Sequence, residues 1–547
     1  MSHRENLILL LLAAFVLIGL GIWEHTGVTG KDEYYLGLRT PMCMQEQKQW
    51  LVPCLDNEPR LKKPPMVYWL TRGSYELFGV SLTSARLVAV IFAVLMIVTT
   101  ALIAIELTTS IAYASLAGLV ALSFIGLGVG GRLLELDVPV AAFSALSFYF
   151  LLRWYRRDQG PALMAAAVFL AMGFLTKGPV VAVVCGGGAL ALLATDPDAR
   201  RFLARRWPAA LGALILFLAL ALPWFLYVAQ LHPERSAEEL GSELAARNFL
   251  QLSPVPLYGI LLLSLPWSFV LLAAPSGLFR LTLEERRHAL MLALWLALTL
   301  LPFFFFKTFE RYLFGSLVPI ALLLAILVRP NLPRIQRWAA RLGLALTLVL
   351  VTGLLGAAFW LSGMALALLA TIPPLAWFIH TWWQARQPRL MALSAALLWS
   401  ACLGWVYPHL GINKIPPHII EQAREQSVAL YGGPQPALLP GVLGRSLVHL
   451  DGRWRLSAEM RQACARFVVF APAGEAAKAR EGLEQRAYHV HELERFGVLS
   501  SRVAWYRMGR TGLTREQAWE ALKRGDIEAI KPQVVMFQAK NTQCDSG

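Results

Sequence analysis

Residues 83–105 read TSARLVAVIFAVLMIVTTALIAI, and no charged side chain occurs from Leu87 to Ile105. A helix needs about 20 predominantly apolar residues to cross a bilayer, so this stretch is predicted to span a membrane. The rest of the chain has a similar composition, with 57% hydrophobic and 16% charged residues among 547. So few charges could not cover a globular surface. This excludes a disordered chain, a disulfide-dense secreted scaffold and a soluble enzyme with one anchor.

Further apolar segments on both sides of this stretch bring the number of predicted spans to thirteen. They are residues 6–22, 83–105, 110–129, 137–153, 161–176, 178–195, 208–228, 255–279, 288–306, 311–329, 341–361, 363–383 and 390–408. The first one resembles a signal peptide, but Gly21 to Glu24 provides no small-x-small cleavage site, and we interpret it as a retained helix.

The arginine-rich short turns predict the orientation. If the N-terminus is cytoplasmic, every such turn falls on the cytoplasmic side, as the positive-inside rule requires. These turns contain Arg153/Arg156/Arg157, Arg200/Arg201/Arg205/Arg206, Arg280/Arg286/Arg287, Arg329/Arg334/Arg337 and Arg386/Arg389. The net charge of +15 is explained in part by this topology, and we expect no nucleic-acid partner. An odd number of spans places the C-terminal tail outside the cytoplasm.

We therefore predict a polytopic α-helical membrane domain over residues 1–409 and an extracytoplasmic α/β domain over residues 410–547. The outer loop 23–82 contains two amphipathic stretches, 66–70 and 75–78, which are predicted to be interfacial helices. In the tail, residues 466–471 and 501–508 are predicted strands. Residues 513–524 are a predicted helix that opens at Thr514.

Three carboxylates on the outer side are candidate catalytic groups. Asp32 and Glu33 follow the first span, and Asp137 begins the fourth. A carboxylate at such a position could act as a general base or orient a sugar hydroxyl. The alternatives are a solvated turn for the adjacent pair and a plain helix cap for Asp137, which Pro139 follows two residues later.

Cations accompany these carboxylates on the outer side. Arg60, Lys62 and Lys63 precede a Pro-Pro pair, and Lys177 stands between two spans. A later loop on the outer side contains Lys307, Arg311 and Tyr312, and the 229–254 loop contains Arg247. Lysine, arginine and tyrosine can hold a phosphate by charge and hydrogen bonding. Contacts with lipid headgroups are the alternative for each of them.

In a cavity lined by these groups, the cations would bind an anionic lipid headgroup, and a carboxylate nearby could act as a base. The chain contains no Walker loop, dinucleotide fingerprint, CxxC motif or Ser-His-Asp order. An enzyme with this composition would therefore take activated groups from a lipid carrier. Cys43 and Cys54 could form a disulfide in an oxidising compartment, and Cys464 could pair with Cys544.

Four motifs resemble the C-type glycosyltransferases that depend on lipid carriers, a protein-mannosyltransferase-like family, and above all its lipid A aminoarabinose transferase branch. The most specific is WLVPCLDNEPRLKKPPMVYWL at residues 50–70. LDVP at 136–139, LTKGP at 175–179 and KTFERYLFGSLVP at 307–319 match later outer-loop patterns. The likeness covers roughly residues 1–410 in order, whereas the tail matches only in its placement.

The resemblance implies an inner-membrane enzyme that moves a sugar from undecaprenyl phosphate to an acceptor on the periplasmic face. In the aminoarabinose branch the acceptor is lipid A. The resemblance makes Asp32 the principal catalytic carboxylate and Asp137 its supporting partner. Lys63, Arg247 and Tyr312 would hold the carrier phosphate.

One departure from the family pattern concerns a metal. The family has a glutamate before Lys-Pro-Pro where this chain has Lys62, and residues 240–249 contain no histidine, although His232 lies upstream. We therefore predict no metal site and no required cofactor. The same change leaves the sugar and the acceptor open, and a protein O-mannosyltransferase-like activity remains an alternative.

Two other functions are compatible with thirteen spans. A lipid-linked glycan flippase would place charges at mid-membrane depth and show internal symmetry. An assembly scaffold that presents the tail would not need the cluster at 50–70. The candidate charges occur at span ends on one side, which favours the enzyme.

Overall fold

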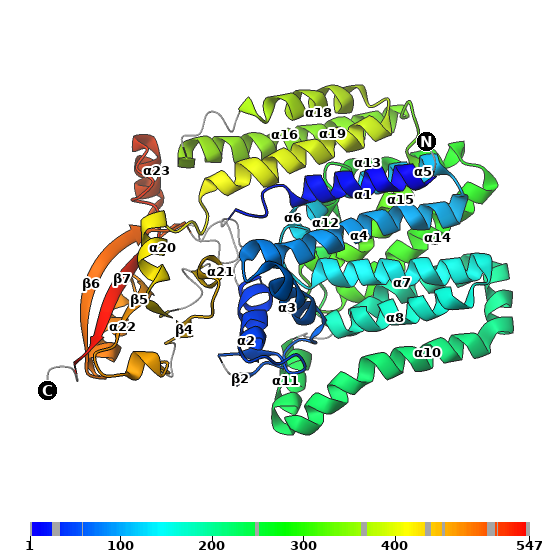
Figure 1. Ribbon diagram of the computed structural model, residues 1–547. Coiled ribbons are helices and arrows are strands. Elements are labelled where there is room, and N and C mark those ends of the chain that lie inside the picture. Colours follow the sequence, from blue (N-terminus) through cyan, green and yellow to red (C-terminus); the bar gives the residue numbers. More distant parts are fainter. Residues whose placement is uncertain are drawn as a thin grey trace.

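The computed structural model describes residues 3–24, 33–56, 58–246, 251–362, 369–432, 439–450, 454–499, 509–510 and 512–542. Long helices lie side by side in a bundle, and a five-stranded sheet stands beyond one end of it (Figure 1). The long bundle helices are α1 (His3–Gly19), α4 (Leu82–Thr108), α7 (Asp137–Arg157), α8 (Gly160–Lys177), α9 (Val180–Thr195), α10 (Pro197–Leu231), α14 (Leu283–Leu300), α16 (Arg334–Ser362), α18 (Ile372–Gln384) and α19 (Pro388–Ala401).

Shorter elements complete the bundle. They are α5 (Ile111–Leu122), α6 (Ile125–Gly130), α12 (Val255–Leu263), α13 (Ser268–Ala273), η2 (Ala274–Arg280), η3 (Leu301–Phe304), η4 (Glu310–Ser316), α15 (Leu317–Leu327), η5 (Cys402–Val406) and η6 (Tyr407–Leu410). The opening stretch of the sequence forms α4, which Ser81 caps by accepting a hydrogen bond from the Ser84 amide. Its apolar surface packs against α1, α5 and α7, so α4 lies inside the bundle.

All thirteen predicted spans coincide with helices, although residues 363–368 of one lie outside the described part of the chain. Within the described residues, eight helical segments are long and apolar enough to cross a membrane, or nine if the bent pair formed by α12 and α13–η2 is one span. This number is lower than predicted because α1, α9 and α18 are shorter than 18 residues and a break separates α5 from α6. The molecule is a multi-pass membrane protein.

The arginine-rich turns meet at the end of the bundle that is remote from the sheet (Figure 1). Arg157 pairs with Glu106 at 2.8 Å, and Arg287 pairs with Asp196 at 2.8 Å. The Arg389 guanidinium donates to the Ala112 carbonyl of a neighbouring turn. This common location agrees with the predicted topology.

The outer loop forms several short elements at the opposite end of the bundle, facing the sheet (Figure 1). These are η1 (Glu33–Arg39), α2 (Thr40–Glu46), β1 (Cys54–Leu55), β2 (Glu58–Pro59), α3 (Met66–Phe78) and, from a later loop, α11 (Pro233–Ala246). The two helices predicted at 66–70 and 75–78 are one continuous helix, α3, because the residues between them include no proline and Thr71 donates to the Val67 carbonyl at 2.8 Å. Cys43 and Cys54 form the predicted disulfide.

The C-terminal region contains a mixed sheet in the order β4-β3-β5-β7-β6. Its strands are β3 (Ser427–Leu430), β4 (Val448–His449), β5 (Arg466–Pro472), β6 (Tyr488–Gly497) and β7 (Gln533–Asn541). Helices α20 (Pro417–Arg424), α21 (Leu439–Leu443), α22 (Ala476–Glu484) and α23 (Arg515–Arg524) and the turn η7 (Glu459–Arg461) accompany it. Phe467 and Val469 pack on one face of the sheet, whereas Val468 and Phe470 pack on the other.

The predictions for this region are confirmed where they can be compared. The strand at 466–471 is β5, and the predicted helix is α23, where Thr514 and Gln517 form a capping box. The strand predicted at 501–508 lies outside the described residues, as does Cys544. Cys464 is disulfide-bonded.

Candidate active site

Asp137, Lys177 and Arg311 come together at the outer end of the bundle although they are distant in sequence. Asp137 is the first residue of α7, Lys177 the last of α8, and Arg311 belongs to η4. The Lys177 ammonium pairs with Asp137 Oδ1, and Arg311 Nε lies 3.7 Å from Asp137 Oδ2. The Asp137 and Lys177 side chains are only 6% and 12% exposed, so both charges are largely desolvated.

The alternative role of Asp137 as a helix cap is not realised. Leu136 occupies the cap position of α7, and the Asp137 carboxylate makes no capping hydrogen bond. The carboxylate is directed to the two cations instead. Partly buried ion pairs of this kind cluster at functional sites, because desolvation makes their charges costly to keep.

Aromatic rings form one wall of the cluster. The Lys177 ammonium lies 3.8 Å from the centre of the Tyr312 ring, and the Arg311 guanidinium lies 5.6 Å from the centre of the Phe309 ring. Lys307 is exposed and contacts the Phe309 ring at 6.0 Å. Tyr312 and Arg311 therefore belong to the cluster, whereas Lys307 lies at its margin.

The Lys-Lys-Pro-Pro segment approaches the cluster from the outer loop. Lys63 pairs with Glu243 of α11 at 2.7 Å, and α3, which begins three residues later at Met66, packs against α8. Arg60 lies with its guanidinium 5.6 Å from the centre of the Tyr35 ring, away from Lys63 and toward the sheet domain. Lys62 is exposed.

The position of Lys62 also bears on the metal that the family branch can hold. A lysine cannot replace a carboxylate ligand, because its ammonium has no lone pair to donate. Among the described residues, no group of three or more His, Cys, Asp or Glu side chains is arranged to hold a metal ion. The residues that the structure describes therefore do not fit that metal.

Glu33 is completely buried. Its Oε1 accepts hydrogen bonds from Arg86 Nε of α4 at 3.0 Å and from the Leu134 amide at 3.4 Å. This enclosure favours a positioning role for Glu33, and the direct catalytic role stays a prediction. Asp32 and Arg247 lie outside the described residues.

An apolar pocket of about 450 Å³ lies between α3, α8 and α10. Trp69, Trp224 and Leu175 are among its lining residues. Leu175 and Lys177 both lie in the last turn of α8, so the pocket is at the same end of this helix as the charged cluster. The apolar side chains that line the pocket suit a hydrocarbon chain.

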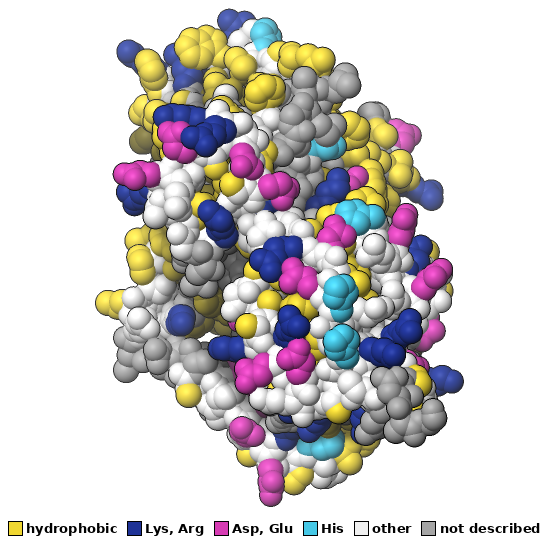
Figure 2. All heavy atoms as spheres, turned by 90° about the vertical axis from the view of Figure 1, so that its left-hand side faces the viewer, with side chains coloured by type: hydrophobic (Ala, Val, Ile, Leu, Met, Phe, Trp, Pro, Cys, Tyr) yellow, Lys and Arg dark blue, Asp and Glu magenta, His cyan; other side chains and the backbone are white. Residues whose placement is uncertain are grey.

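A larger cavity, of about 1220 Å³, separates the outer loop and α11 from the sheet domain. Six arginines and four carboxylates line it: Arg39, Arg60, Arg235, Arg455, Arg461 and Arg486, and Glu46, Asp56, Glu58 and Glu239. Figure 2 looks onto this end of the molecule and shows a recess with lysine and arginine side chains at its rim.

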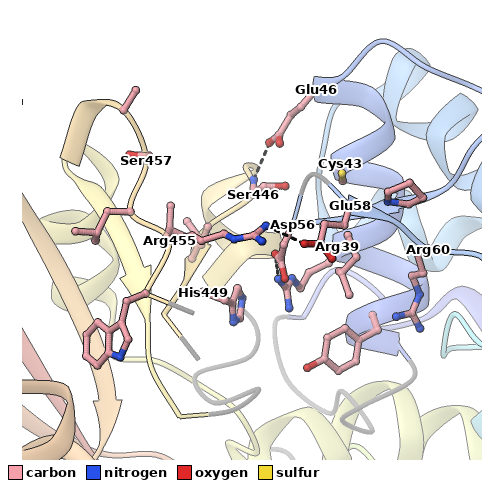
Figure 3. Close-up of a pocket in the computed structure, with 18 of the residues that line it drawn as sticks. Arg39, Cys43, Glu46, Asp56, Glu58, Arg60, Ser446, His449, Arg455 and Ser457 are labelled. Carbon is pink, nitrogen blue, oxygen red and sulfur yellow. Dashed lines mark hydrogen bonds and ion pairs between the residues drawn. The ribbon is translucent and has the colours of Figure 1, made fainter. Parts of the chain in front are cut away.

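Ion pairs within this cavity join the two domains. Arg455 of the sheet domain reaches Glu58 of β2 at 2.8 Å, while Arg39 pairs with Asp56 within the outer loop (Figure 3). In the described part of the chain, Arg60, Arg461 and Arg486 form no ion pair with a carboxylate. The cavity therefore has cationic groups to offer to an anionic ligand.

Several residues of these sites were not predicted from the sequence. Two of them are Glu135, whose Oε1 lies 3.5 Å from Arg311 Nη1, and Glu243, which pairs with Lys63. Arg86 could have been found, because it is an ionisable residue inside a predicted span. The arginines of the sheet domain carried no signal, since surface arginines are common.

Residues 62–227 match the family model of dolichyl-phosphate-mannose-protein mannosyltransferases. The matched residues include Lys63, Asp137 and Lys177.

The structure of ArnT from Cupriavidus metallidurans bound to undecaprenyl phosphate is similar to this chain, with a TM-score of 0.68 and 16% identity over 96% of this chain and 97% of that one. The apo structure of the same protein gives a TM-score of 0.66 and 17% identity over 91% and 96% of the two chains. The fold is therefore the C-type glycosyltransferase membrane fold, as the resemblance implied.

An uncharacterized protein of Aquifex aeolicus (strain VF5) is 31% identical over 264 residues, which is 48% of this chain and 51% of that protein. A second from the same organism is 31% identical over 189 residues, or 32% of this chain and 40% of its own length. The alignments thus span about half or less of the curated relatives.

Proposed function

We propose that this protein is a glycosyltransferase that moves a sugar from a polyprenyl phosphate, such as undecaprenyl phosphate, to an envelope acceptor. The observation that carries the proposal is the Asp137–Lys177–Arg311 cluster, in which Asp137 and Lys177 are largely desolvated and which lies at the same end of α8 as the apolar pocket between α3, α8 and α10. This arrangement suits a ligand with a phosphate head and an isoprenoid tail. The family match and the fold similarity to an undecaprenyl phosphate-bound transferase support it.

In the proposed reaction the bond between C1 of the sugar and the carrier phosphate oxygen breaks, and the electron pair stays on the phosphate. This developing negative charge is stabilised by three cations, Lys63, Lys177 and Arg311. Tyr312, whose ring lies against Lys177, supplies a hydroxyl at the same end of the bundle. Attack on C1 opposite the leaving phosphate inverts the anomer. Asp137 holds Lys177 and Arg311 at the leaving group.

The acceptor decides what else is needed. If the nucleophile is a hydroxyl, a general base must remove its proton, and we propose Asp32 for this role on the basis of the family resemblance. If it is a phosphate monoester, it is already anionic, and Asp32 positions it. Lipid A as acceptor and 4-amino-4-deoxy-L-arabinose as sugar remain our preferred substrates from the resemblance.

We assign the acceptor to the arginine-lined cavity between the membrane domain and the sheet domain. It opens at the same end of the molecule as the charged cluster and offers Arg60, Arg461 and Arg486 to an anionic group. A phosphorylated glycolipid headgroup fits this chemistry, because arginine binds phosphate in a bidentate manner. The protein would then act at the periplasmic face of the inner membrane, with residues 1–409 forming the transferase domain and residues 410–547 completing the acceptor site.

A flippase is less well supported. Asp137 begins α7 and Lys177 ends α8, so the charges lie at helix ends instead of at mid-membrane depth. An enzyme that works on headgroups at the surface needs its charges there, whereas translocation needs them along a path through the bilayer.

Purified protein in nanodiscs should transfer a sugar from an undecaprenyl phosphate-linked donor, with the product identified by mass spectrometry. We expect Lys177→Met to lower the transfer rate by about a hundredfold, because removing one donor to a developing oxyanion costs about 10²–10³ in kcat. The control is Lys478→Ala, which alters an exposed lysine of α22. Equal rates in the two variants would contradict the proposal.

Changing Arg461 and Arg60 to alanine should raise the KM for a phosphorylated acceptor about tenfold and leave the KM for the donor unchanged. The reason is that these guanidinium groups line the proposed acceptor cavity and are not engaged by carboxylates in the described structure. The measurement compares the acceptor with its dephosphorylated form, for which the variant and the parent should be equally poor. A rise in donor KM would place the arginines at the carrier instead.

A further inference from the structure

A hydrogen bond joins the sheet domain to the buried core of the outer loop. The hydroxyl of Tyr34, which is completely buried on η1, lies 2.8 Å from Nε2 of His449 at the end of β4. Figure 3 shows His449 next to Arg39 at the wall of the interdomain cavity. Burial, together with the charge of Arg39, lowers the pKa of His449 to about 3. The imidazole is therefore neutral at physiological pH and can accept a hydrogen bond from the tyrosine hydroxyl.

Tyr34 is adjacent to the residues that touch the Asp137 segment. Its neighbour Glu33 accepts a hydrogen bond of 3.4 Å from the Leu134 amide, and Leu134 is three residues before Asp137. Gly37, one turn along η1, lies so close to Leu134 that a Cβ added to Gly37 would be 3.2 Å from the Leu134 side chain. The segment 33–39 is thus packed between the sheet domain and the loop that leads into α7.

This hydrogen bond is accompanied by apolar packing of α21 against η1 and by polar contacts of a different kind. Glu46 accepts the Ser446 amide, and Arg455 pairs with Glu58, and both contacts are open to solvent. Exposed ion pairs hold their partners weakly, because water screens them and the long side chains lose entropy. The Tyr34–His449 hydrogen bond is directional and buried on the tyrosine side, so it can fix the position of η1.

We infer that His449 is a positioning residue for the membrane site. Its hydrogen bond to Tyr34 fixes the position of η1, and η1 packs against Leu134. The loop that contains Leu134 then holds Asp137 in contact with Lys177 and Arg311. This inference rests on the proposed function, because it gives the sheet domain a part in the transfer reaction. The contacts His449–Tyr34, Glu33–Leu134 and Asp137–Lys177 form the continuous physical connection that such a role requires.

The kinetic test compares His449→Ala with His449→Gln, whose amide can reach the same hydroxyl. We expect His449→Ala to lower kcat about tenfold with the affinity for undecaprenyl phosphate unchanged, and His449→Gln to recover most of the rate. His489→Ala, an exposed histidine of β6, is the control and should behave like the parent. A purely structural role would lower the melting temperature of His449→Ala but leave kcat per folded molecule unchanged, which would overturn the inference.

A double-mutant cycle adds the partner. Tyr34→Phe should lower kcat by a similar factor, and the Tyr34→Phe/His449→Ala double variant should be no slower than either single variant, because all three lose the same hydrogen bond. Multiplication of the two single effects would show that the residues act separately, and the inference would then be wrong.

Hydrogen exchange separates this inference from the proposed function, since it needs no turnover. His449→Ala should increase amide exchange in residues 33–39 and 131–137, whereas α14 stays as protected as in the parent. If exchange rises there but no sugar transfer is found in any variant, the coupling stands and the proposed function fails. If exchange is unchanged in both segments, the coupling itself is refuted.

Discussion

Asp137→Asn is expected to reduce glycosyl transfer by about 10²–10³, the range seen when a donor to a developing oxyanion is removed. Asparagine keeps the shape of the side chain but removes the charge that holds both Lys177 and Arg311. The two cations would then repel each other in a largely desolvated site and would move away from the leaving phosphate. The rate is measured under single-turnover conditions with a saturating donor, so that binding and chemistry are separated.

The matched control for this change is Asp158→Asn. Asp158 also pairs with an arginine, Arg206, but it does so at the opposite end of the bundle, and its side chain is 47% exposed. Transfer by this variant should equal that of the parent. If Asp137→Asn keeps more than half of the parent rate, Asp137 does not organise the cations, and the reaction must depend on other groups.

Arg86→Met is expected to destabilise the folded protein by about 3–5 kcal/mol, the cost of leaving one partner of a buried ion pair uncompensated. Glu33 has no exposed surface, and its Oε2 has no hydrogen-bond partner among the described residues. Without Arg86, the carboxylate must either remain charged in a medium that solvates it poorly or take up a proton. Thermal unfolding in nanodiscs, followed by tryptophan fluorescence, measures the loss.

A second substitution makes this prediction specific. Removing both charges, as Glu33→Leu/Arg86→Met, should recover much of the stability, because no uncompensated charge remains. Arg201→Ala is the control, since Arg201 and Asp198 form an ion pair with side chains 74% and 72% exposed. It should change stability by no more than about 1 kcal/mol. If Arg86→Met is as stable as this control, the buried Glu33–Arg86 pair does not stabilise the folded protein.

The helices were predictable from the sequence because lipid imposes a simple rule. A chain that crosses a bilayer must satisfy its backbone hydrogen bonds internally, so an apolar run of sufficient length becomes a helix. α4 and α14 follow this rule closely. The predictions were less accurate where residues break a helix locally, as between α5 and α6 or between α12 and α13, where length and hydropathy do not reveal the bend.

The sequence predicted which residues belong to the cluster but not how their side chains are arranged. Asp137, Lys177 and Arg311 were selected because ionisable groups at span ends are costly. The contacts of Glu33 were not predicted: the sequence offered a catalytic carboxylate or a solvated turn, whereas the side chain is buried and pairs with Arg86 of α4. Only the packing of η1 against α4 reveals that difference.

The sequence by itself determined the approximate limits of the apolar segments, the grouping of the arginine-rich turns at one end of the bundle, and the similarity of residues 62–227 to a mannosyltransferase family. These properties are local, since hydropathy, charge and motif can be evaluated within short windows of the chain. The tertiary structure decided which charges meet, how the interdomain cavity forms, and that His449 reaches Tyr34 across 415 residues. Such contacts depend on how helices and sheet pack together, and no short window of sequence contains that information.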